Sequence, residues 1–359
     1  MLTKEKFLAV AKPDLGKDEE EAVLKVLRGG WLGYGAKAIE FERKFSEEVK
    51  VEHAIAVSSA TIGLIIALRA FGVGSGDEVI TTPLTFAATI NAILAIGAKP
   101  VFADVNENGL INPVEILLKV TSKTKAILPV HLWGFPCDME NINTIAKRYD
   151  LKVIEDAAHS FGFFELKGDV AVFSFYPTKN ITCGDGGMIV TNDQKKSNIM
   201  RILAAQGLSA DSWDRYGDTP TREYQVQFDG YKGQIDDISA SIGLAQLNRW
   251  PELKEKRHSL FNKYEVAFGF KLQGSEHIYE IRVPNRAEFR ERIYHKGIGT
   301  GIHYNPLHLE PAYKFLGGRI GDFPIAEKIG RETVSLPLST TMDLDDIFRV
   351  IEVINKGDA

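Results

Sequence analysis

Between residues 53 and 192 the sequence alternates short β-branched apolar runs with segments whose apolar residues recur at helical spacing. The runs with strand character are HAIAVSS, EVITTP, KPVFADV, KAILPVHLWG, LKVIEDAA, VAVFSF and GGMIVTN. Several of them are apolar at nearly every position, which is typical of strands covered by helices on both faces of a parallel sheet. The alternation predicts an α/β fold built on a mostly parallel, seven-stranded sheet.

The chain has 359 residues, more than the ~250 to 300 that one hydrophobic core usually fills, so two domains are expected. A helical pattern begins at Asp236 and reaches Pro251, which should end or kink the helix at Trp250 and begin a second one. We therefore predict a large domain over residues 1–249, with an N-terminal segment that contacts the small domain. The small domain, over residues 250–359, is predicted to be α+β.

Composition narrows the classes of partner. The 43 basic and 48 acidic residues give a net charge of −5, so no electrostatic footprint for nucleic acid or an anionic membrane is present. The two cysteines, Cys137 and Cys183, form no CxxC pair, and no histidine spacing suits a metal site. Neither a signal peptide nor an apolar run approaching the ~20 residues of a membrane helix is visible. We expect a soluble cytoplasmic protein with a small-molecule partner and no metal.

Polar residues gather where two of the predicted strands end. Asp156 and His159 end one run, and Ser174 and Lys179 end the next. In open α/β sheets the ligand binds outside the carboxyl ends of the strands, so these four side chains could meet in one pocket. A lysine taken alone is far more often an exposed surface residue, so the pattern needs support from the rest of the sequence.

That support is a resemblance that extends over nearly the whole chain. The motifs that carry it include LGKDEEEAVLKVLRGGWLGYG, GDEVITTPLTFAATINAI, IEDAAHSFG, FSFYPTKNITCGDGGMIVTND, DGYKGQIDDISASIGLAQL and GIGTGIHYNPLH. They are similar to motifs of the DegT/DnrJ/StrS family of nucleotide-sugar aminotransferases, which depend on pyridoxal 5'-phosphate (PLP). The resemblance implies the PLP-dependent transferase fold of type I, which is aspartate aminotransferase-like and carries a smaller C-terminal α+β domain.

Three residues match the family's catalytic positions. Lys179, in PTKN, matches the lysine that binds the cofactor aldehyde covalently and shuttles a proton once it is released. Asp156, in EDAAH, matches the carboxylate that keeps the pyridine nitrogen protonated and makes the ring an electron sink. His159 matches a Gln or His beside the cofactor's phenolic oxygen, although a lone histidine could equally be a plain residue of the pocket wall.

Other matched positions would bind the ring and phosphate of the cofactor. Phe86, in LTFAAT, matches an aromatic residue that stacks on the ring. Ser59, Ala60 and Thr61 join the first strand to a helix, where backbone N–H groups can bind a phosphate, although the same residues would also make an ordinary helix cap. Ser174 matches a further residue whose hydroxyl binds the phosphate.

A third motif concerns the neighbouring subunit. Lys232, in GYK, matches a residue that reaches the phosphate from the other chain, so it implies a homodimer with shared active sites. The family usually continues with Tyr and then Arg or Asn, whereas this chain has Gly233 and Gln234. The edge of the site supplied by the partner is therefore expected to differ, which affects the substrate.

Two further expectations concern loops. Residues 207–230 have no period and predict a long surface excursion. Residues 156–179 and 267–277 look short for the family, which indicates trimmed loops that remove no catalytic group.

The resemblance implies that an amino group moves from glutamate, or a similar donor, to a nucleotide-linked keto sugar, as in polysaccharide biosynthesis. The sequence KNITCGDGG is nearer to members that aminate C4 than to the C3 group, whose motif usually runs KNLGALGDGG, and we favour a UDP-linked 4-keto sugar. Family matches place Trp31, Tyr34, His303 and Tyr304 at the pocket mouth as substrate-binding residues, although exposed aromatic and charged residues there could be ordinary surface.

Three alternatives stay open. Some relatives replace the lysine with histidine and act as sugar dehydratases, and Lys179 argues against that branch. A non-catalytic PLP-binding regulator of genes would need a basic patch or a helix-turn-helix module, neither of which the sequence carries. A nucleotide-binding domain without chemistry would leave the spacing of Asp156 and Lys179 as coincidence.

Overall fold

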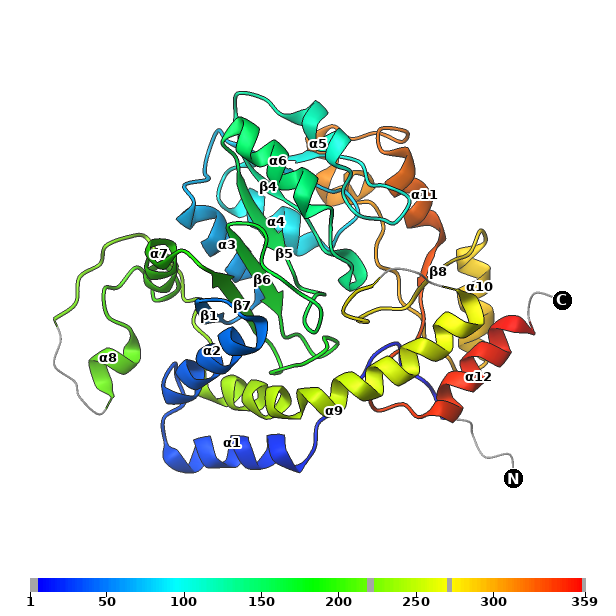
Figure 1. Ribbon diagram of the computed structural model, residues 1–359, viewed down its shortest axis with the longest axis horizontal. Helices are drawn as coiled ribbons and strands as arrows, with labels where there is room; N and C mark the ends of the chain where they lie inside the picture. Colours follow the sequence, from blue (N-terminus) through cyan, green and yellow to red (C-terminus); the bar gives the residue numbers. More distant parts are fainter. Residues whose placement is uncertain (1–5, 218–222, 270–272, 357–359) are drawn as a thin grey trace.

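The computed structural model describes residues 6–217, 223–269 and 273–356. A seven-stranded sheet in the order β1-β7-β6-β5-β4-β2-β3 lies at its centre (Figure 1). Its strands are β1 His53–Val57, β2 Glu78–Thr81, β3 Lys99–Phe102, β4 Thr124–Leu128, β5 Lys152–Asp156, β6 Val170–Ser174 and β7 Gly187–Thr191. Only β7 runs antiparallel to its neighbours, β1 and β6. The predicted α/β fold, the predicted strands and the mostly parallel sheet are confirmed.

Helices cover both faces of this sheet. They are α2 Ala36–Val49, α3 Ala60–Ala70, α4 Ala87–Ala95, α5 Pro113–Lys119, α6 Met139–Tyr149, α7 Gln194–Ala204 and α9 Asp237–Phe268. The helix α1 Lys17–Gly29 packs on α9, and α8 Ser212–Tyr216 lies away from the sheet. Along β1, Ile55 and Val57 pack with α3, α4 and α7, whereas Ala54 and Ala56 pack with α2 and α9. Because successive strand residues point to opposite faces, both sets are apolar, which explains the continuous apolar run in the sequence.

The C-terminal part adds a small two-stranded sheet beside the large one. It consists of β8 Glu280–Arg282 and β9 Thr333–Ser335, with the helices α10 Arg286–His295, α11 Pro324–Glu332 and α12 Leu344–Asn355. One apolar cluster joins α10, α11 and α12 to the half of the large sheet that contains β2 and β4. Residues 298–304, with the sequence IGTGIHY, form no strand and contribute isolated bridges only, at Ile298 and Gly301. No helix among the described residues has the length and apolar character needed to span a membrane.

Of the helix end or kink predicted at Trp250, the end and the start of a second helix are wrong. The helix α9 continues for 32 residues through Pro251, although Figure 1 shows it bending partway along its length. Pro251 cannot donate the usual hydrogen bond to Leu247, which weakens the helix at that turn. Trp250 and Leu253 flank this turn and are both buried, and Trp250 packs on Phe161 with ring centroids 4.7 Å apart. The buried packing of Trp250 and Leu253 therefore outweighs the local cost of proline. The predicted domain boundary, between residues 249 and 250, falls inside this helix. The division into two domains stays a prediction.

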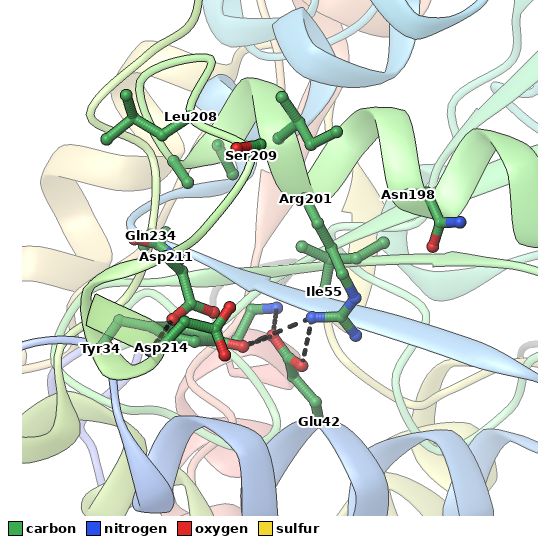
Figure 2. Close-up of a pocket in the computed structure, with 14 residues that line it drawn as sticks. Tyr34, Glu42, Ile55, Asn198, Arg201, Leu208, Ser209, Asp211, Asp214 and Gln234 are labelled. Carbon is green, nitrogen blue, oxygen red and sulfur yellow. Dashed lines mark hydrogen bonds and ion pairs between the residues drawn. The ribbon is translucent and has the colours of Figure 1, made fainter. Parts of the chain in front are cut away.

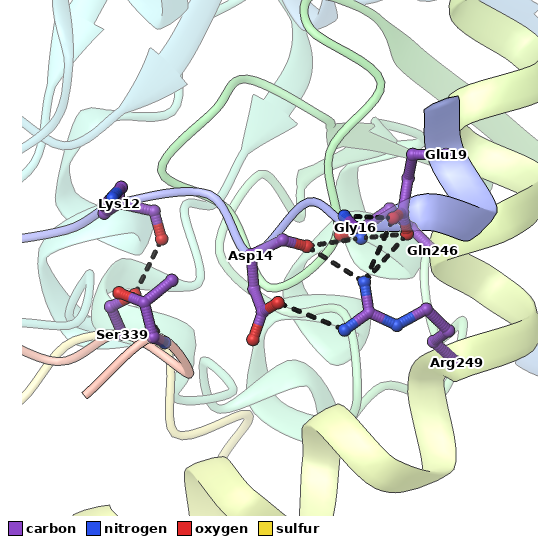
Figure 3. A network of polar contacts seen from close by, with 8 residues as sticks. Lys12, Asp14, Gly16, Glu19, Gln246, Arg249 and Ser339 are labelled. Atoms are coloured by element: carbon purple, nitrogen blue, oxygen red, sulfur yellow. Dashed lines mark hydrogen bonds and ion pairs between the residues drawn. The ribbon is translucent and has the colours of Figure 1, made fainter. Parts of the chain in front are cut away.

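The N-terminal segment runs across both parts of the molecule before α1 begins. Leu8 exchanges two backbone hydrogen bonds with the C-terminal part, 2.8 Å to the Gly297 carbonyl and 2.7 Å from the Gly299 N–H. Figure 3 shows the next contacts, in which Arg249 of α9 lies 3.1 Å from the Asp14 carboxylate and 3.0 Å from the Glu19 carboxylate. This network attaches the segment firmly to α9.

The free edge of β1 is covered by side chains in a small cavity of about 320 Å³, here called the edge cavity (Figure 2). Arg201 of α7 donates to the Ala54 carbonyl at 2.6 Å, and Glu42 of α2 accepts from the Ala56 N–H at 2.9 Å. The two side chains also form an ion pair of 2.7 Å with each other. A carboxylate and a guanidinium thus occupy the hydrogen-bonding positions that a neighbouring strand would fill.

Candidate active site

A second cavity, of about 590 Å³ and here called the site cavity, opens at the carboxyl ends of β5 and β6 and at the start of α3. A ligand is expected at these strand ends, and the structure places most of the predicted site residues on the cavity wall. They are Ser59, Ala60, Thr61, Phe86, Asp156, His159, Ser174, Lys179, His303 and Tyr304. Residues that are scattered along the sequence therefore meet in one place, while their individual roles stay predictions.

One end of the site cavity is the N-terminus of α3. Ser59 is the N-cap, and its hydroxyl accepts a hydrogen bond from the Ile62 N–H at 3.3 Å. A Cβ atom on Gly187 of β7 would lie 2.7 Å from the Ala60 nitrogen, so only glycine lets the strand pass this close to the helix start. Ser174 ends β6 on the same wall. Free N–H groups, the helix dipole and these hydroxyls together favour a phosphate.

Asp156 is buried at the end of β5. Its carboxylate accepts a hydrogen bond of 2.8 Å from the Thr89 hydroxyl and one of 3.2 Å from the Ala158 N–H. Burial raises the pKa of Asp156, while Thr89, Ala158 and the positive charge of Lys179 oppose that rise. The charged form would therefore gain from a cationic partner inside the cavity, such as a protonated ring nitrogen.

Lys179 lies in a turn that follows β6, where its N–H donates to the Tyr176 carbonyl at 2.9 Å. Burial lowers the pKa of its amine to about 8, against the attraction of Asp156. Among the described residues, the amine has no hydrogen-bond or ion-pair partner. A buried amine that is neither paired nor fully protonated near neutral pH is suited to attack a carbonyl and to move a proton.

His159 is held in one tautomer. The backbone N–H of Trp133 donates to its Nδ1 at 3.2 Å, so Nδ1 carries no proton and Nε2 must carry it. Nε2 lies 3.3 Å from the Tyr304 hydroxyl. Burial, and then the positive charge of Lys179, lower the pKa of His159 well below its ordinary value. The imidazole is therefore neutral and presents a hydrogen-bond donor on the cavity side, as a phenolic oxygen would require.

Phe86 and Tyr304 are neighbours on the cavity wall, with ring centroids 5.8 Å apart and ring planes tilted by 41°. Phe86 precedes α4 and is 60% exposed, so a large part of its surface is open to a ligand. Near Tyr304, burial and the charge of Lys179 lower the pKa of His303 to about 4. An aromatic wall of this kind can stack on a flat ring.

Three of the predicted residues lie outside the wall of the site cavity. Tyr34 lines the edge cavity, where its hydroxyl donates to Glu42 at 3.2 Å and only 6% of its surface is exposed. Trp31 packs against Trp213, with ring centroids 4.9 Å apart. Lys232 forms a bridge with Ala205 and is absent from the site cavity of its own chain. Of the predicted surface excursion, residues 218–222 lie outside the described part of the chain.

Two residues of the site were not found by sequence reasoning. Thr89 lies one helical turn after Phe86 at the start of α4, so the spacing within LTFAAT could have indicated it. His277 comes from the segment before β8, is buried, and lines the site cavity together with Lys179. No local motif marks His277, because its position depends on how the C-terminal part packs against the sheet.

The donor set of the site cavity fits PLP. The phosphate suits the N-terminus of α3, the ring nitrogen suits Asp156, the phenolic oxygen suits His159 and the aldehyde suits Lys179. Three or more His, Cys, Asp or Glu side chains placed to hold a metal ion are not found among the described residues.

Comparisons with known proteins agree with this geometry. The sequence profile of the DegT/DnrJ/EryC1/StrS aminotransferase family matches residues 13–355. The spore coat polysaccharide biosynthesis protein SpsC of Bacillus subtilis is 39% identical over 97% of this chain and 96% of SpsC.

Solved structures match over nearly the same length. PseC of Helicobacter pylori, an aminotransferase involved in the biosynthesis of pseudoaminic acid, is 28% identical, with a TM-score of 0.90 over 98% of this chain and 99% of PseC. NtdA of Bacillus subtilis, solved with bound PMP, is 29% identical, with a TM-score of 0.85 over 95% of this chain and 82% of NtdA. These matches confirm the predicted fold, the enzyme class and PLP as the cofactor. The chain therefore belongs to the DegT/DnrJ/EryC1/StrS aminotransferase family of PLP-dependent enzymes.

Proposed function

We propose that this aminotransferase moves an amino group from glutamate, or a similar donor, to C4 of a UDP-linked 4-keto sugar. The single observation that carries the chemistry is the site cavity itself, in which a buried amine of lowered pKa and a buried carboxylate lie near a helix N-terminus. When bound, PLP supplies an electrophilic carbonyl and a ring that accepts electrons.

Each side chain has a defined task in this proposal. The start of α3 and Ser174 bind the phosphate, and Phe86 supports one face of the ring. Asp156 holds a proton on the ring nitrogen, because its buried carboxylate is stabilised by a nearby cation. Nε2–H of His159 donates to the phenolic oxygen. The free amine of Lys179 would move a proton from the carbon of the amino donor to C4' of the cofactor in one half-reaction, and from C4' to the sugar carbon in the other.

The sugar substrate is supported by the relatives, since SpsC is named for spore coat polysaccharide biosynthesis and PseC for pseudoaminic acid biosynthesis. A nucleotide sugar is a bulky anion, and the net charge of −5 gives no long-range attraction. Affinity must therefore come from local groups. His303 and Tyr304 line the site cavity and are proposed to bind the substrate, whereas Trp31 and Tyr34 lie outside its wall in this chain.

A homodimer completes the proposed site. Lys232 does not reach the cavity of its own chain, which agrees with a role in the cavity of a partner chain. The loop before it exposes large apolar side chains, with Tyr224 49%, Val226 71% and Phe228 41% exposed. A second copy that covers these side chains would bring the partner's loop to the site, as shared active sites require. The proposed location of the enzyme is the cytoplasm.

The test is a panel of substrates. The amine form of the holoenzyme is mixed with UDP-, dTDP- and GDP-linked keto sugars and with simple keto acids, and the return of the aldehyde-form absorbance is followed. We expect the fastest return with a UDP-linked 4-keto sugar. If simple keto acids discharge the amine while every keto sugar leaves the spectrum unchanged, the proposed sugar substrate is wrong, although the aminotransferase class stands.

A further inference from the structure

Asp156 is held in place through its backbone at the end of β5. Its N–H donates to the Pro129 carbonyl at 2.9 Å, and its carbonyl accepts a hydrogen bond of 3.1 Å from the His131 N–H. Both contacts come from the segment that follows β4, so the backbone of Asp156 is fixed relative to the neighbouring strand. What can still change at this residue is the proton of its carboxyl group, and the contacts of the side chain decide where that proton lies.

Each oxygen of the Asp156 carboxylate accepts one hydrogen bond from within the chain. The Ala158 N–H donates to Oδ1 at 3.2 Å, and the Thr89 hydroxyl donates to Oδ2 at 2.8 Å. A carboxylate oxygen can accept a second hydrogen bond, and Asp156 lines the site cavity. The two donors therefore fix the carboxylate from behind and leave it able to bind a ligand in front.

A second threonine fixes the direction of the Thr89 hydroxyl. The hydroxyl oxygens of Thr85 and Thr89 lie 2.8 Å apart, and the two residues are 1% and 0% exposed. Each hydroxyl has a single hydrogen, and Thr89 gives its own to Asp156, so the hydrogen between the two threonines comes from Thr85. The result is a directed chain from Thr85 through Thr89 to Asp156, here called the threonine relay, in which each hydrogen bond strengthens the next.

The threonine relay comes from the segment that also supplies an aromatic ring to the cavity wall. Phe86 lies between Thr85 and Thr89 in the sequence and precedes α4. Valine has nearly the shape of threonine, so packing alone does not require a hydroxyl at either buried position. Buried hydroxyls are costly unless they are hydrogen-bonded, which indicates that these two are kept for their contact with the carboxylate.

We propose that Thr89 is a positioning residue that acts through Asp156: its hydroxyl, oriented by Thr85, stabilises the charged carboxylate, so that a proton shared with a ligand nitrogen stays on the nitrogen. The proposal rests on the proposed role of Asp156 toward the ring nitrogen of PLP and is independent of the sugar. A hydrogen-bond donor makes a carboxylate a weaker base, so its loss would move the shared proton toward Asp156. A ring nitrogen without its proton is a poorer electron sink.

The charges around Asp156 agree with this role. Burial is the main cause that raises the pKa of Asp156, and the hydrogen bond from Thr89 is the largest of the causes that oppose the rise. The Ala158 N–H and the charges of Lys179 and His131 oppose it as well. The titratable groups that face Asp156 or share its cavity wall are Lys179, His131, His159 and Tyr304.

Two variants of Thr89 separate the hydroxyl from the shape of the side chain. Thr89→Val replaces the hydroxyl with a methyl group, whereas Thr89→Ser keeps the hydroxyl and loses the methyl group. Each variant is compared with its parent by urea unfolding of the cofactor-free full-length protein, at one protein concentration and several pH values. The same comparison in an Asp156→Asn background, where no charge forms, shows which part of the cost depends on the carboxylate.

Thr81→Val is the matched control. Thr81 is 0% exposed, and its hydroxyl donates to the Leu128 carbonyl at 2.7 Å, which is a neutral acceptor. Its loss should therefore cost the same stability at every pH.

We expect the cost of Thr89→Val to grow with pH by about tenfold in the unfolding equilibrium constant, because loss of the hydroxyl raises the pKa of Asp156 by about one unit. The variant's folded state then holds the proton to a higher pH than the wild type does, so its stability falls further as the pH rises. The growth lies between the folded pKa values of the two proteins, both above the ordinary 3.8. Thr89→Ser should not show it.

A cost of Thr89→Val that is equal at every pH, or a growth with pH that persists in the Asp156→Asn background, would overturn the proposal. Should Thr89→Val not fold, Thr89→Ala takes its place under the same two criteria. The measurement needs neither cofactor nor sugar, so its failure is distinct from failure of the substrate panel.

Discussion

The edge cavity and the site cavity hold the same kinds of side chain in opposite states. In the edge cavity, Glu42 and Arg201 bind each other at 2.7 Å and take up the free backbone groups of β1. In the site cavity, Lys179 and Asp156 are buried in one space, and no hydrogen bond or ion pair joins them among the described residues. The ion pair of the edge cavity closes the edge of β1, whereas the buried amine of Lys179, which has no partner among the described residues, is available for a ligand.

The difference between the two cavities also separates two roles of a buried ionisable residue, a structural role and a functional one. A perturbed pKa is found at structural ion pairs and at active sites alike, so the shift by itself does not identify function. What distinguishes the site cavity is the unpaired lysine next to a helix N-terminus and an exposed aromatic ring. Variants in the two cavities test this distinction.

Replacing Lys179 should have the largest effect. Lys179→Ala removes the amine, so turnover should fall by on the order of a thousandfold or more, while phosphate and ring contacts still bind PLP. Borohydride reduction of the wild-type holoenzyme should fix the cofactor to the peptide that contains Lys179, and mass mapping of the variant should find no label. A label on any other lysine would contradict the proposed role of Lys179.

Asp156→Asn should be next in size. A neutral amide cannot hold a proton on the ring nitrogen, so the rate should drop on the order of a hundredfold or more while fold and cofactor content are kept. Steady-state turnover measures the rate, and the absorbance spectrum of the bound cofactor measures how much cofactor the variant retains. Near wild-type turnover would show that Asp156 is a structural residue, like Glu42.

The unpaired charge of Lys179 should also appear in the stability of the cofactor-free protein. Its pKa is about 8 in the fold and 10.5 in a model peptide, so between these pH values the unfolded chain binds more protons, and the stability rises with pH. Below pH 8 the full penalty of the buried ammonium applies, and above pH 10.5 it is gone. Relative to Lys179→Met, the wild type should gain up to about 3 kcal/mol across this window.

Urea unfolding of the wild type and of Lys179→Met at several pH values measures this difference. The titration of all other ionisable groups is common to both proteins and cancels in the difference. Lys195→Met, at an exposed position on α7, is the matched control and should show no such window. A wild-type stability that follows Lys179→Met at every pH would contradict the buried, unpaired state of the amine.

The smallest effect is expected in the edge cavity. Glu42→Gln keeps the shape of the side chain but removes its charge, so the free energy of unfolding should fall by about 2 kcal/mol, the usual size for a hydrogen bond to a charged group. Turnover per folded molecule should stay at the wild-type level, because Glu42 lies outside the site cavity. Loss of turnover without loss of stability would break the comparison between the two cavities.

Much of the site was predictable because it follows local rules. Asp156 and Ser174 end strands, Ser59 begins a helix, and parallel strands bring such positions to one edge of the sheet. The alternation of apolar runs predicted each strand of the large sheet for the same reason. Family motifs added Lys179 and Phe86, which composition alone would have left as an exposed lysine and a core aromatic.

Other features could not be predicted, since distant residues decide them. Pro251 indicates a helix end locally, but the buried contacts of Trp250 keep α9 continuous. Tyr34 belongs to a motif of the substrate region, yet in this chain its hydroxyl faces Glu42. His277 enters the site because a segment far from Lys179 is anchored by Asn180 and Arg257.

The sequence by itself determined the strands, their mostly parallel sheet and the residue types of the site, because hydrophobic periodicity and strand-end chemistry are local properties. Only the tertiary structure decided which charged groups are paired and which tautomer His159 adopts. The hydrogen bond from Trp133 assigns the proton of His159, and these two residues come from parts of the chain that meet only after folding. Burial and pairing of a side chain depend on how distant parts of the chain pack together. They set the lowered pKa of Lys179 that the chemistry requires.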